Sequence, residues 1–170
     1  METTKDIHGM IRVNQAGEYG AVRIYQGQCA VLGKNADLQK MLTQEKEHLK
    51  QFNRLMIEHK VRPTLMQPIW HVGGYVLGAV TALLGEKAAH ACTIAVETVI
   101  DEHYQNQLRD LESSADHQDL RSVIHKCHEE EIDHKSIATE KGGEDAKGFA
   151  LLNETIQAIS KSAIWLSSRI

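Results

Sequence analysis

The stretch from Leu38 to Met56, LQKMLTQEKEHLKQFNRLM, carries the clearest pattern in the chain. Its apolar residues recur at spacings of three and four, which is the period of one face of an α-helix. Glu45 and His48 interrupt this apolar face rather than the polar one. We therefore expect a helix whose buried side carries a carboxylate and an imidazole.

A second stretch, from Leu120 to Ile137, repeats the arrangement with Glu131 and His134 on its apolar face. Glu129 and Glu130 lie off this face, and we expect them to be solvated. The Glu-x-x-His spacing alone is weak evidence, because roughly one such pair arises by chance in a chain of this composition. The position of each pair on a buried face carries the argument.

Each of these helices follows a helix that carries one glutamate, Glu18 or Glu97, and a tyrosine seven residues later. Residues 8–59 and 87–140 therefore form two versions of one helical hairpin, a quasi-repeat of about 50 residues. Glu97 lies within the apolar string ACTIAVETVI, without Lys or Arg within a turn. A buried lone carboxylate must be neutralised, paired or bound to a metal.

Glu18 is weaker evidence for a buried acid, because Arg12 and Arg23 are close enough in sequence to pair with it. Taken together, however, the two hairpins would present four carboxylates and two imidazoles to the interior of one bundle. This is the ligand set of di-iron and di-manganese carboxylate bundles, and iron and manganese both fit it. The candidate metal ligands are Glu18, Glu45, His48, Glu97, Glu131 and His134.

Composition favours one all-α domain over residues 1–170. The chain is 42% hydrophobic but only 5% aromatic, and it has two prolines. The net charge of −4, without a continuous basic stripe, argues against nucleic acid as a partner. Turn-forming segments at 33–37, 61–68, 112–119 and 141–148 separate the helices. The expected helices cover residues 8–32, 38–59, 69–84, 87–111, 119–140 and 149–168.

The cysteines and the remaining histidines are expected to be structural or superficial. Cys29, Cys92 and Cys127 are far apart and form no Cys-x-x-Cys pair, so we interpret them as core residues in a reducing compartment. The histidines that we assign to helix ends, polar faces or turns are His8, His59, His71, His90, His117, His125 and His128.

The apolar crossover from Ile69 to Leu84, IWHVGGYVLGAVTALL, is shorter than the roughly 20 residues that a membrane-spanning helix needs. Gly73, Gly74 and Gly78 would let it pack closely on another helix. Alternatively, it lies at a membrane interface and admits an apolar substrate from the lipid.

Several strings are longer than a ligand set requires, and they resemble a known family from about Ile11 to the C-terminus. These strings are IRVNQAGEYGA (11–21), RIYQGQ (23–28), QEKEHLKQFN (44–53), RPT (62–64), ALLGEKAA (82–89), ACTIAVE (91–97), HYQNQL (103–108) and EEEIDH (129–134). They resemble the demethoxyubiquinone hydroxylase family, the di-iron monooxygenases of late ubiquinone biosynthesis.

The resemblance implies a ferritin-like four-helix bundle core with additional helices, two iron ions, and O2-dependent hydroxylation of a polyprenyl demethoxybenzoquinol ring. It implies Glu45 and Glu131 as bridging ligands, and it matches His103 and Tyr104 to an electron or proton transfer pair. The chain departs from the family pattern at Thr98, where a second Glu is common, and at Lys135, where a His is common. Neither departure removes a ligand.

The expected partners are the polyprenyl quinol, O2 and a membrane surface. No Gly-x-Gly-x-x-Gly fingerprint occurs, so the electrons come from the quinol itself or from an external donor such as NADH acting through the quinone. The N-terminus shows neither a signal nor a transit pattern. We expect peripheral attachment to the cytoplasmic face of a bacterial membrane or to the matrix face of the mitochondrial inner membrane. A homo-oligomer or a quinone-delivering partner protein stays open.

Two other classes of function stay as alternatives. A ferritin-like ferroxidase or iron-binding protein shares the ligand pattern, but the family strings and the apolar crossover argue against it. A metal-free quinone-binding helical scaffold would retain its fold and its ligand without iron. A peroxide-reducing relative would carry a rubredoxin-like Cys-x-x-Cys pair, which is absent.

Overall fold

The computed structural model describes residues 6–33, 35–112 and 117–170, and in these residues it contains helices and no strand. The predicted turns at 33–37 and 112–119 therefore lie partly outside the described residues. The elements are α1 (Ile7–Leu32), α2 (Ala36–Glu58), α3 (Gln67–Leu83), α4 (Glu86–Leu111), α5 (Gln118–Glu140), the short 3-10 helix η2 (Gly143–Asp145) and α6 (Phe149–Ser167).

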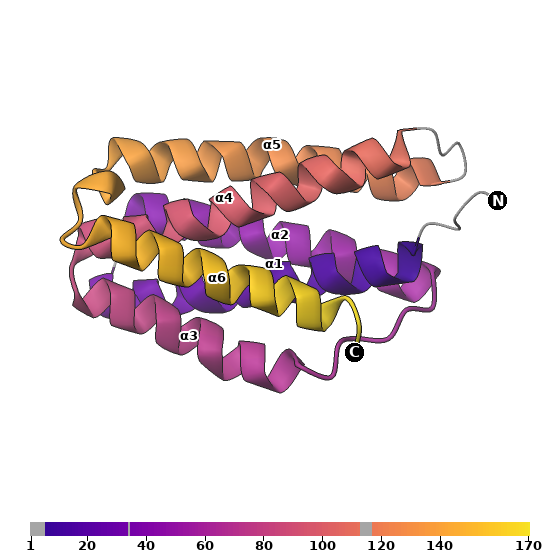
Figure 1. The fold of residues 1–170 in the computed structure, drawn as a ribbon, viewed down its shortest axis with the longest axis horizontal. Helices are drawn as coiled ribbons and strands as arrows, with labels where there is room; N and C mark the ends of the chain where they lie inside the picture. The colour runs from indigo at the N-terminus through magenta and orange to yellow at the C-terminus, as the bar shows by residue number, and fades with distance from the viewer. Residues whose placement is uncertain (1–5, 34, 113–116) are drawn as a thin grey trace.

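The helices run side by side along the long axis of the molecule (Figure 1). α1 packs on α2 and α4 packs on α5, while α2 also contacts α5 and closes the four-helix core. α3 packs along α1, and α6 packs along α4 and touches α1. This is the all-α bundle with additional helices that the sequence predicts.

Local signals explain where the helices begin. Asn35 caps α2 by accepting hydrogen bonds from the backbone N–H groups of Asp37 and Leu38, both at 3.1 Å. α2 therefore begins at Ala36, two residues before the predicted start. α3 begins at Gln67, also two residues early, because Pro68 lies in the first turn, where its missing N–H costs nothing. Gly85 has a φ of 115°, which allows the sharp break between α3 and α4.

Two of the apolar clusters of the buried core are built by residues of the four-helix core. One contains Ile11, Phe52, Tyr104 and Ile124, and the other contains Val22, Tyr25, Leu38 and Met41. In both α2 and α5 the Glu-x-x-His residues fall between the parts of the helix that build these two clusters. The polar interior is therefore enclosed by apolar packing at both ends.

Two of the three glycines expected at a helix contact do pack against α1. A Cβ added to Gly78 would lie 1.9 Å from the carbonyl oxygen of Ile24, and one added to Gly74 would lie 2.9 Å from that of Gly20. Gly73 meets nothing within 4 Å, so its predicted packing role is wrong. The close approach of α3 to α1 rests on the other two.

No helix in the described part of the chain has the length and apolar character needed to cross a membrane.

Candidate metal centre

The six candidate ligands come together in the middle of the four-helix core, and all are almost completely buried. Their exposed fractions lie between 0% and 3%. α1 supplies Glu18 and α4 supplies Glu97, while α2 and α5 supply the two Glu-x-x-His pairs. Neither Arg12 nor Arg23 approaches Glu18, because both guanidinium groups bind backbone oxygens elsewhere.

The ligand atoms form two groups that share two residues. One group contains Glu18, Glu45, His48 and Glu131, and the other contains Glu45, Glu97, Glu131 and His134. Within each group the atoms lie within 4.8 Å of one another. The shared residues are therefore Glu45 and Glu131.

The two shared carboxylates each direct one oxygen to each imidazole. Glu131 places Oε1 3.1 Å from Nδ1 of His48 and Oε2 2.9 Å from Nδ1 of His134. Glu45 places Oε1 3.2 Å from Nδ1 of His134 and Oε2 4.0 Å from Nδ1 of His48. This is the placement that a carboxylate bridging two cations requires.

The outer nitrogens of both imidazoles are held by α2 and α5 side chains that the sequence pattern did not single out. Nε2 of His48 lies 2.9 Å from Glu130 Oε2, and Nε2 of His134 lies 3.3 Å from Gln44 Oε1. Such contacts fix the tautomer with Nδ1 free to bind a metal. Glu129 is exposed as expected, but Glu130 is only partly solvated, with 27% of its side chain exposed, because α5 places it beside His48 at the edge of the core.

Without a metal, only protons can neutralise the buried carboxylates, and this requirement is visible in the pKa values of the ligands. Burial raises the pKa values of Glu45 and Glu97 well above their usual range, and the charge of Glu131 raises them further. Burial would also raise the pKa of Glu131, but hydrogen bonds from His134 and His48 lower it to about 2. Burial would lower the pKa of His48, yet Glu131 and Glu18 raise it well above its usual value.

Glu45 provides the test of whether a cation fits. Both of its oxygens are fully buried, and neither has a hydrogen-bond partner. His134 lies near one of them, but its Nδ1 makes the shorter contact with Glu131. An orphaned buried carboxylate amid two imidazoles and three further carboxylates matches the donor chemistry of a pair of divalent cations.

The two tyrosines exchange partners between the hairpins. Tyr25 of α1 donates a hydrogen bond to Glu97 of α4 at 3.1 Å, and Tyr104 of α4 donates one to Glu18 of α1. The sequence shows each Tyr on the side of its own glutamate. It does not show that each reaches the glutamate of the other helix.

His103 lies outside the ligand cluster. Its Nε2 is 3.1 Å from Asn14 Oδ1 and 2.9 Å from Gln107 Nε2. Its ring centroid is 6.1 Å from that of Tyr104. Tyr104 in turn donates a hydrogen bond to Glu18, so His103 lies one side chain away from a candidate ligand. Burial lowers the pKa of His103 to about 4, so the ring is neutral near neutral pH.

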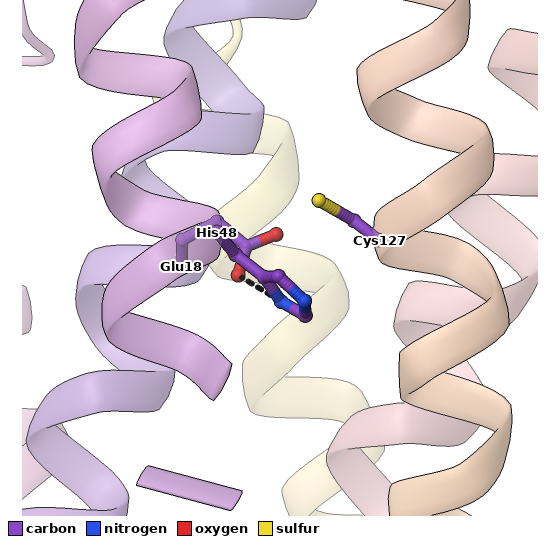
Figure 2. A group of neighbouring side chains, drawn as sticks. All are labelled: Glu18, His48 and Cys127. Carbon is purple, nitrogen blue, oxygen red and sulfur yellow. Dashed lines mark ion pairs between the residues drawn. The ribbon is translucent and has the colours of Figure 1, made fainter. Parts of the chain in front are cut away.

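Cys127 is the residue at the centre that the sequence analysis missed. Its Sγ belongs to a group with Glu18 and His48 whose ligand atoms lie within 4.8 Å of one another. In Figure 2 the side chain points from α5 toward these two residues. The signal was available, since Cys127 precedes Glu131 by four residues and His134 by seven, on the same helix face.

The other histidines are mostly superficial, as expected, with His90 as an exception. His59, 23% exposed, pairs with Asp119 at 2.9 Å, whereas His128 pairs with Asp101 at 2.7 Å and is only 14% exposed. His90 is completely buried in α4. We expected His90 to be superficial, but its side chain is buried because α5 and η2 cover the start of α4.

An apolar cavity of about 310 Å³ lies between α1, α3, α4 and α6. Its wall includes Gly17 and Val96, the residues that directly precede Glu18 and Glu97. Gly20 and Gly73 also line it, and a Cβ at either would meet no atom within 4 Å. The volume is at the lower end of the range for small-molecule sites.

Comparison with known proteins points to one family. Residues 5–167 match the family model described as ubiquinone biosynthesis protein COQ7. The chain is 49% identical over 166 residues to the Bos taurus protein named NADPH-dependent 3-demethoxyubiquinone 3-hydroxylase, mitochondrial, covering 95% of this chain and 76% of the relative.

Relatives from a bacterium and a yeast carry similar names. The Rhodospirillum rubrum protein named 3-demethoxyubiquinol 3-hydroxylase is 48% identical over 168 residues, which cover 96% of this chain and 78% of the relative. The Saccharomyces cerevisiae protein named 5-demethoxyubiquinone hydroxylase, mitochondrial, is 37% identical over 179 residues, covering 95% and 77%.

Proposed function

The chain belongs to the ubiquinone biosynthesis protein COQ7 family, and on this premise we propose that it is a di-iron monooxygenase that hydroxylates the ring of a polyprenyl demethoxybenzoquinol with O2. The names of the relatives support the reaction and the substrate class. The observation that carries the metal part is the placement of Glu45 and Glu131, each with one oxygen toward each imidazole.

We assign the six buried ligands to two iron positions. Glu18 and His48 would hold one ion, Glu97 and His134 would hold the other, and Glu45 and Glu131 would be shared by both. Bound iron would supply the electrons and Lewis acidity that activate O2. The remaining side chains act on the ligands. Glu130 and Gln44 keep each Nδ1 turned inward, and the tyrosine hydroxyls hold the two terminal carboxylates.

The apolar cavity is the proposed site of the quinol ring. Its wall contains Gly17 and Val96, the chain neighbours of the proposed ligands Glu18 and Glu97, and its lining suits an uncharged aromatic ring with an isoprenoid tail. Its largely apolar lining disfavours bound water, so a ring bound there would be shielded from side reactions with solvent.

The electron donor is proposed to be a reduced nicotinamide, as the name of the Bos taurus relative states for NADPH. His103 and Tyr104 would carry electrons or protons toward Glu18. This role is supported by the neutral ring of His103 and by the hydrogen bond from Tyr104 to Glu18. His103→Gln should slow quinol production from NADPH while leaving the iron content unchanged. An unaltered rate would contradict this role.

We propose that α3 attaches the protein peripherally to a membrane, at the cytoplasmic face in a bacterium or the matrix face in a mitochondrion. One side of α3 exposes a stripe of large apolar residues that no helix in the described part of the chain covers. The stripe consists of Ile69, Val72, Val76, Val80 and Leu83, which are 48–73% exposed. α3 also forms a wall of the cavity, so a lipid-borne substrate would enter beside it.

The proposal is tested by removing one buried ligand and comparing it with an exposed glutamate on the same helix. Glu97→Ala should reduce the iron content and abolish ring hydroxylation. Glu102→Ala is the matched control, because Glu102 is mostly exposed and pairs with Lys161 at the surface. O2-dependent hydroxylation that survives Glu97→Ala would overturn the proposed function.

A further inference from the structure

Cys127 occupies a position in the metal centre for which the proposed hydroxylation has no use. Its side chain is 1% exposed, and Sγ lies within 4.8 Å of a carboxylate oxygen of Glu18 and a ring nitrogen of His48. Figure 2 shows the thiol directed from α5 toward these two side chains.

A second observation marks this spot as more than apolar packing. Glu45, which shares a ligand group with Glu18 and His48, is completely buried, and neither of its oxygens has a hydrogen-bond partner. The two residues beside the thiol therefore belong to a ligand group that also contains a buried carboxylate without a hydrogen-bond partner. A thiol at this distance is within reach of chemistry at that position.

The two Glu-x-x-His helices differ in the residue four positions before the glutamate. Met41 is the counterpart of Cys127, because each precedes the glutamate of its Glu-x-x-His pair by four residues. Met41 Sδ lies 3.7 Å from the hydroxyl of Tyr25, on the side of Glu97. Cys127 instead belongs to the Glu18 and His48 side. Among the ligand groups of the described residues, the one that contains a thiol is therefore the group of Glu18 and His48.

We propose that Cys127 is a modification site, whose sulfur accepts an oxygen atom from O2 when the centre is reduced and no quinol occupies the cavity. The inference rests on the proposed function, which supplies the activated O2 and the electron donor. Oxidation of cysteine to sulfenic acid is the first step of the cysteine oxidation ladder.

The step has the same stoichiometry as ring hydroxylation. The thiol, O2, two electrons from the reduced nicotinamide and two protons give one sulfenic acid and one water. The S–O bond forms and the O–O bond breaks. Sulfur provides two of the four electrons that reduce O2, and the donor provides the other two. The thiol hydrogen remains on the product as its hydroxyl.

The modification would limit unproductive turnover. An oxygen atom added to Sγ would enter the space between Glu18 and His48, so a protein that reduces O2 without substrate would inactivate itself. Because the sulfur is buried, peroxide in solution has little access to it. The oxidation is therefore expected to depend on a metal-loaded centre rather than on a diffusible oxidant.

The test compares the three cysteines of one protein sample. Iron-loaded protein is reduced with NADPH and a trace of quinone, exposed to isotopically labelled O2 with and without excess demethoxyquinol, digested, and analysed by mass spectrometry. The peptide with Cys127 should gain one labelled oxygen, or further oxygens of the same origin, mainly when quinol is scarce. Cys92, which is equally buried but lies outside the three ligand groups, is the internal control.

Variants give an independent readout. Cys127→Ser should complete several-fold more turnovers before inactivation than the wild type, and Cys92→Ser should behave like the wild type. If Cys127→Ser does not fold, the peptide analysis of the wild type still decides. The inference would be overturned if Cys127 were oxidised to the same extent in the Glu97→Ala variant without iron as in the wild type. It would also be overturned if Cys127 and Cys92 of the wild type were oxidised equally.

The remaining outcomes separate this inference from the proposed function. Ring hydroxylation with an unmodified Cys127 would overturn the inference and leave the proposed function in place. A protein that binds no iron and forms no product would overturn the proposed function and the inference with it.

Discussion

Tyr104 of α4 donates its hydroxyl hydrogen to Glu18 of α1, although the glutamate on its own helix is Glu97. Tyr25 of α1 makes the reverse contact with Glu97. The two hairpins are therefore joined across the centre by a pair of exchanged hydrogen bonds. Each bond holds a carboxylate that would bind only one of the two cations.

Removing one hydroxyl should weaken one half of the centre. Tyr104→Phe is expected to lower the affinity for the metal at Glu18 and His48, and Tyr25→Phe that for the metal at Glu97 and His134, each by about tenfold or more. Stepwise iron titration of the metal-free protein measures both affinities. Tyr19→Phe is the control, because the hydroxyl of Tyr19 bonds the exposed His71. Equal affinities in all three variants would show that the exchanged bonds do not support the ligands.

The stability of the metal-free protein should decrease as the pH rises. Glu45, Glu97 and His48 have raised pKa values in the folded chain, so the folded state retains protons that the unfolded state releases. A group with a raised pKa stabilises the fold below its unfolded pKa and loses that contribution as the pH rises through its folded value. Between about pH 6.5 and 8 the free energy of unfolding should fall by about 1.4 kcal/mol per pH unit for each retained proton.

Urea denaturation at several pH values measures this slope. Glu131, whose pKa is lowered to about 2, acts in the opposite direction, and only in acid, where stability is lost as the pH falls below about 4.5. Saturating metal should remove the dependence near neutral pH, since cations replace the protons. A metal-free protein whose stability rises from pH 6.5 to 8 would contradict the assigned protonation.

Filling the apolar cavity should block the substrate without removing the metal. Gly20→Leu would project a side chain into space where an added Cβ meets no atom within 4 Å. We expect at least a tenfold loss of kcat/KM for the quinol with unchanged iron content. Ala30→Leu is the matched control, because Ala30 lies on the same helix with an exposed side chain and outside the cavity. Unchanged kinetics in Gly20→Leu would place the ring elsewhere.

The exposed stripe on α3 should govern attachment to lipid. Replacing Val72 and Val80 with Ser removes two apolar side chains that are 61% and 48% exposed. Flotation with phospholipid vesicles should show several-fold weaker binding, with an unchanged helical spectrum. Val31→Ser on α1, where Val31 is 37% exposed, is the control. Binding that is equally strong in the α3 variant would show that another surface attaches the protein.

The helices and the six ligand positions follow from periodicity, because an apolar stripe predicts which side of a helix is buried. Glu45 and His48 interrupt such a stripe, and the structure brings them together with Glu131 and His134. Periodicity defines the direction of a side chain along one helix. It says nothing about which residue of another helix that side chain meets.

The residue surroundings that sequence reasoning did not predict all depend on contacts between helices. Glu130 lies off the apolar face of α5, yet α2 brings His48 to it at 2.9 Å. His90 looked superficial because its helix begins only four residues earlier, but α5 and η2 cover it. Cys127 was interpreted as a core residue because it forms no Cys-x-x-Cys pair, and it does belong to a buried apolar cluster. Only the convergence of α1, α2 and α5 places it beside Glu18 and His48.

The central claim is tested most directly by one measurement on the reduced, iron-loaded protein, which is supplied with a short-chain demethoxyquinol and isotopically labelled O2. Iron content and product mass are determined on the same sample. The account predicts about two irons per chain and a ring that carries one labelled oxygen. Two irons without a labelled product would contradict the monooxygenase and favour a ferroxidase. A protein that binds no iron would contradict the metal centre itself.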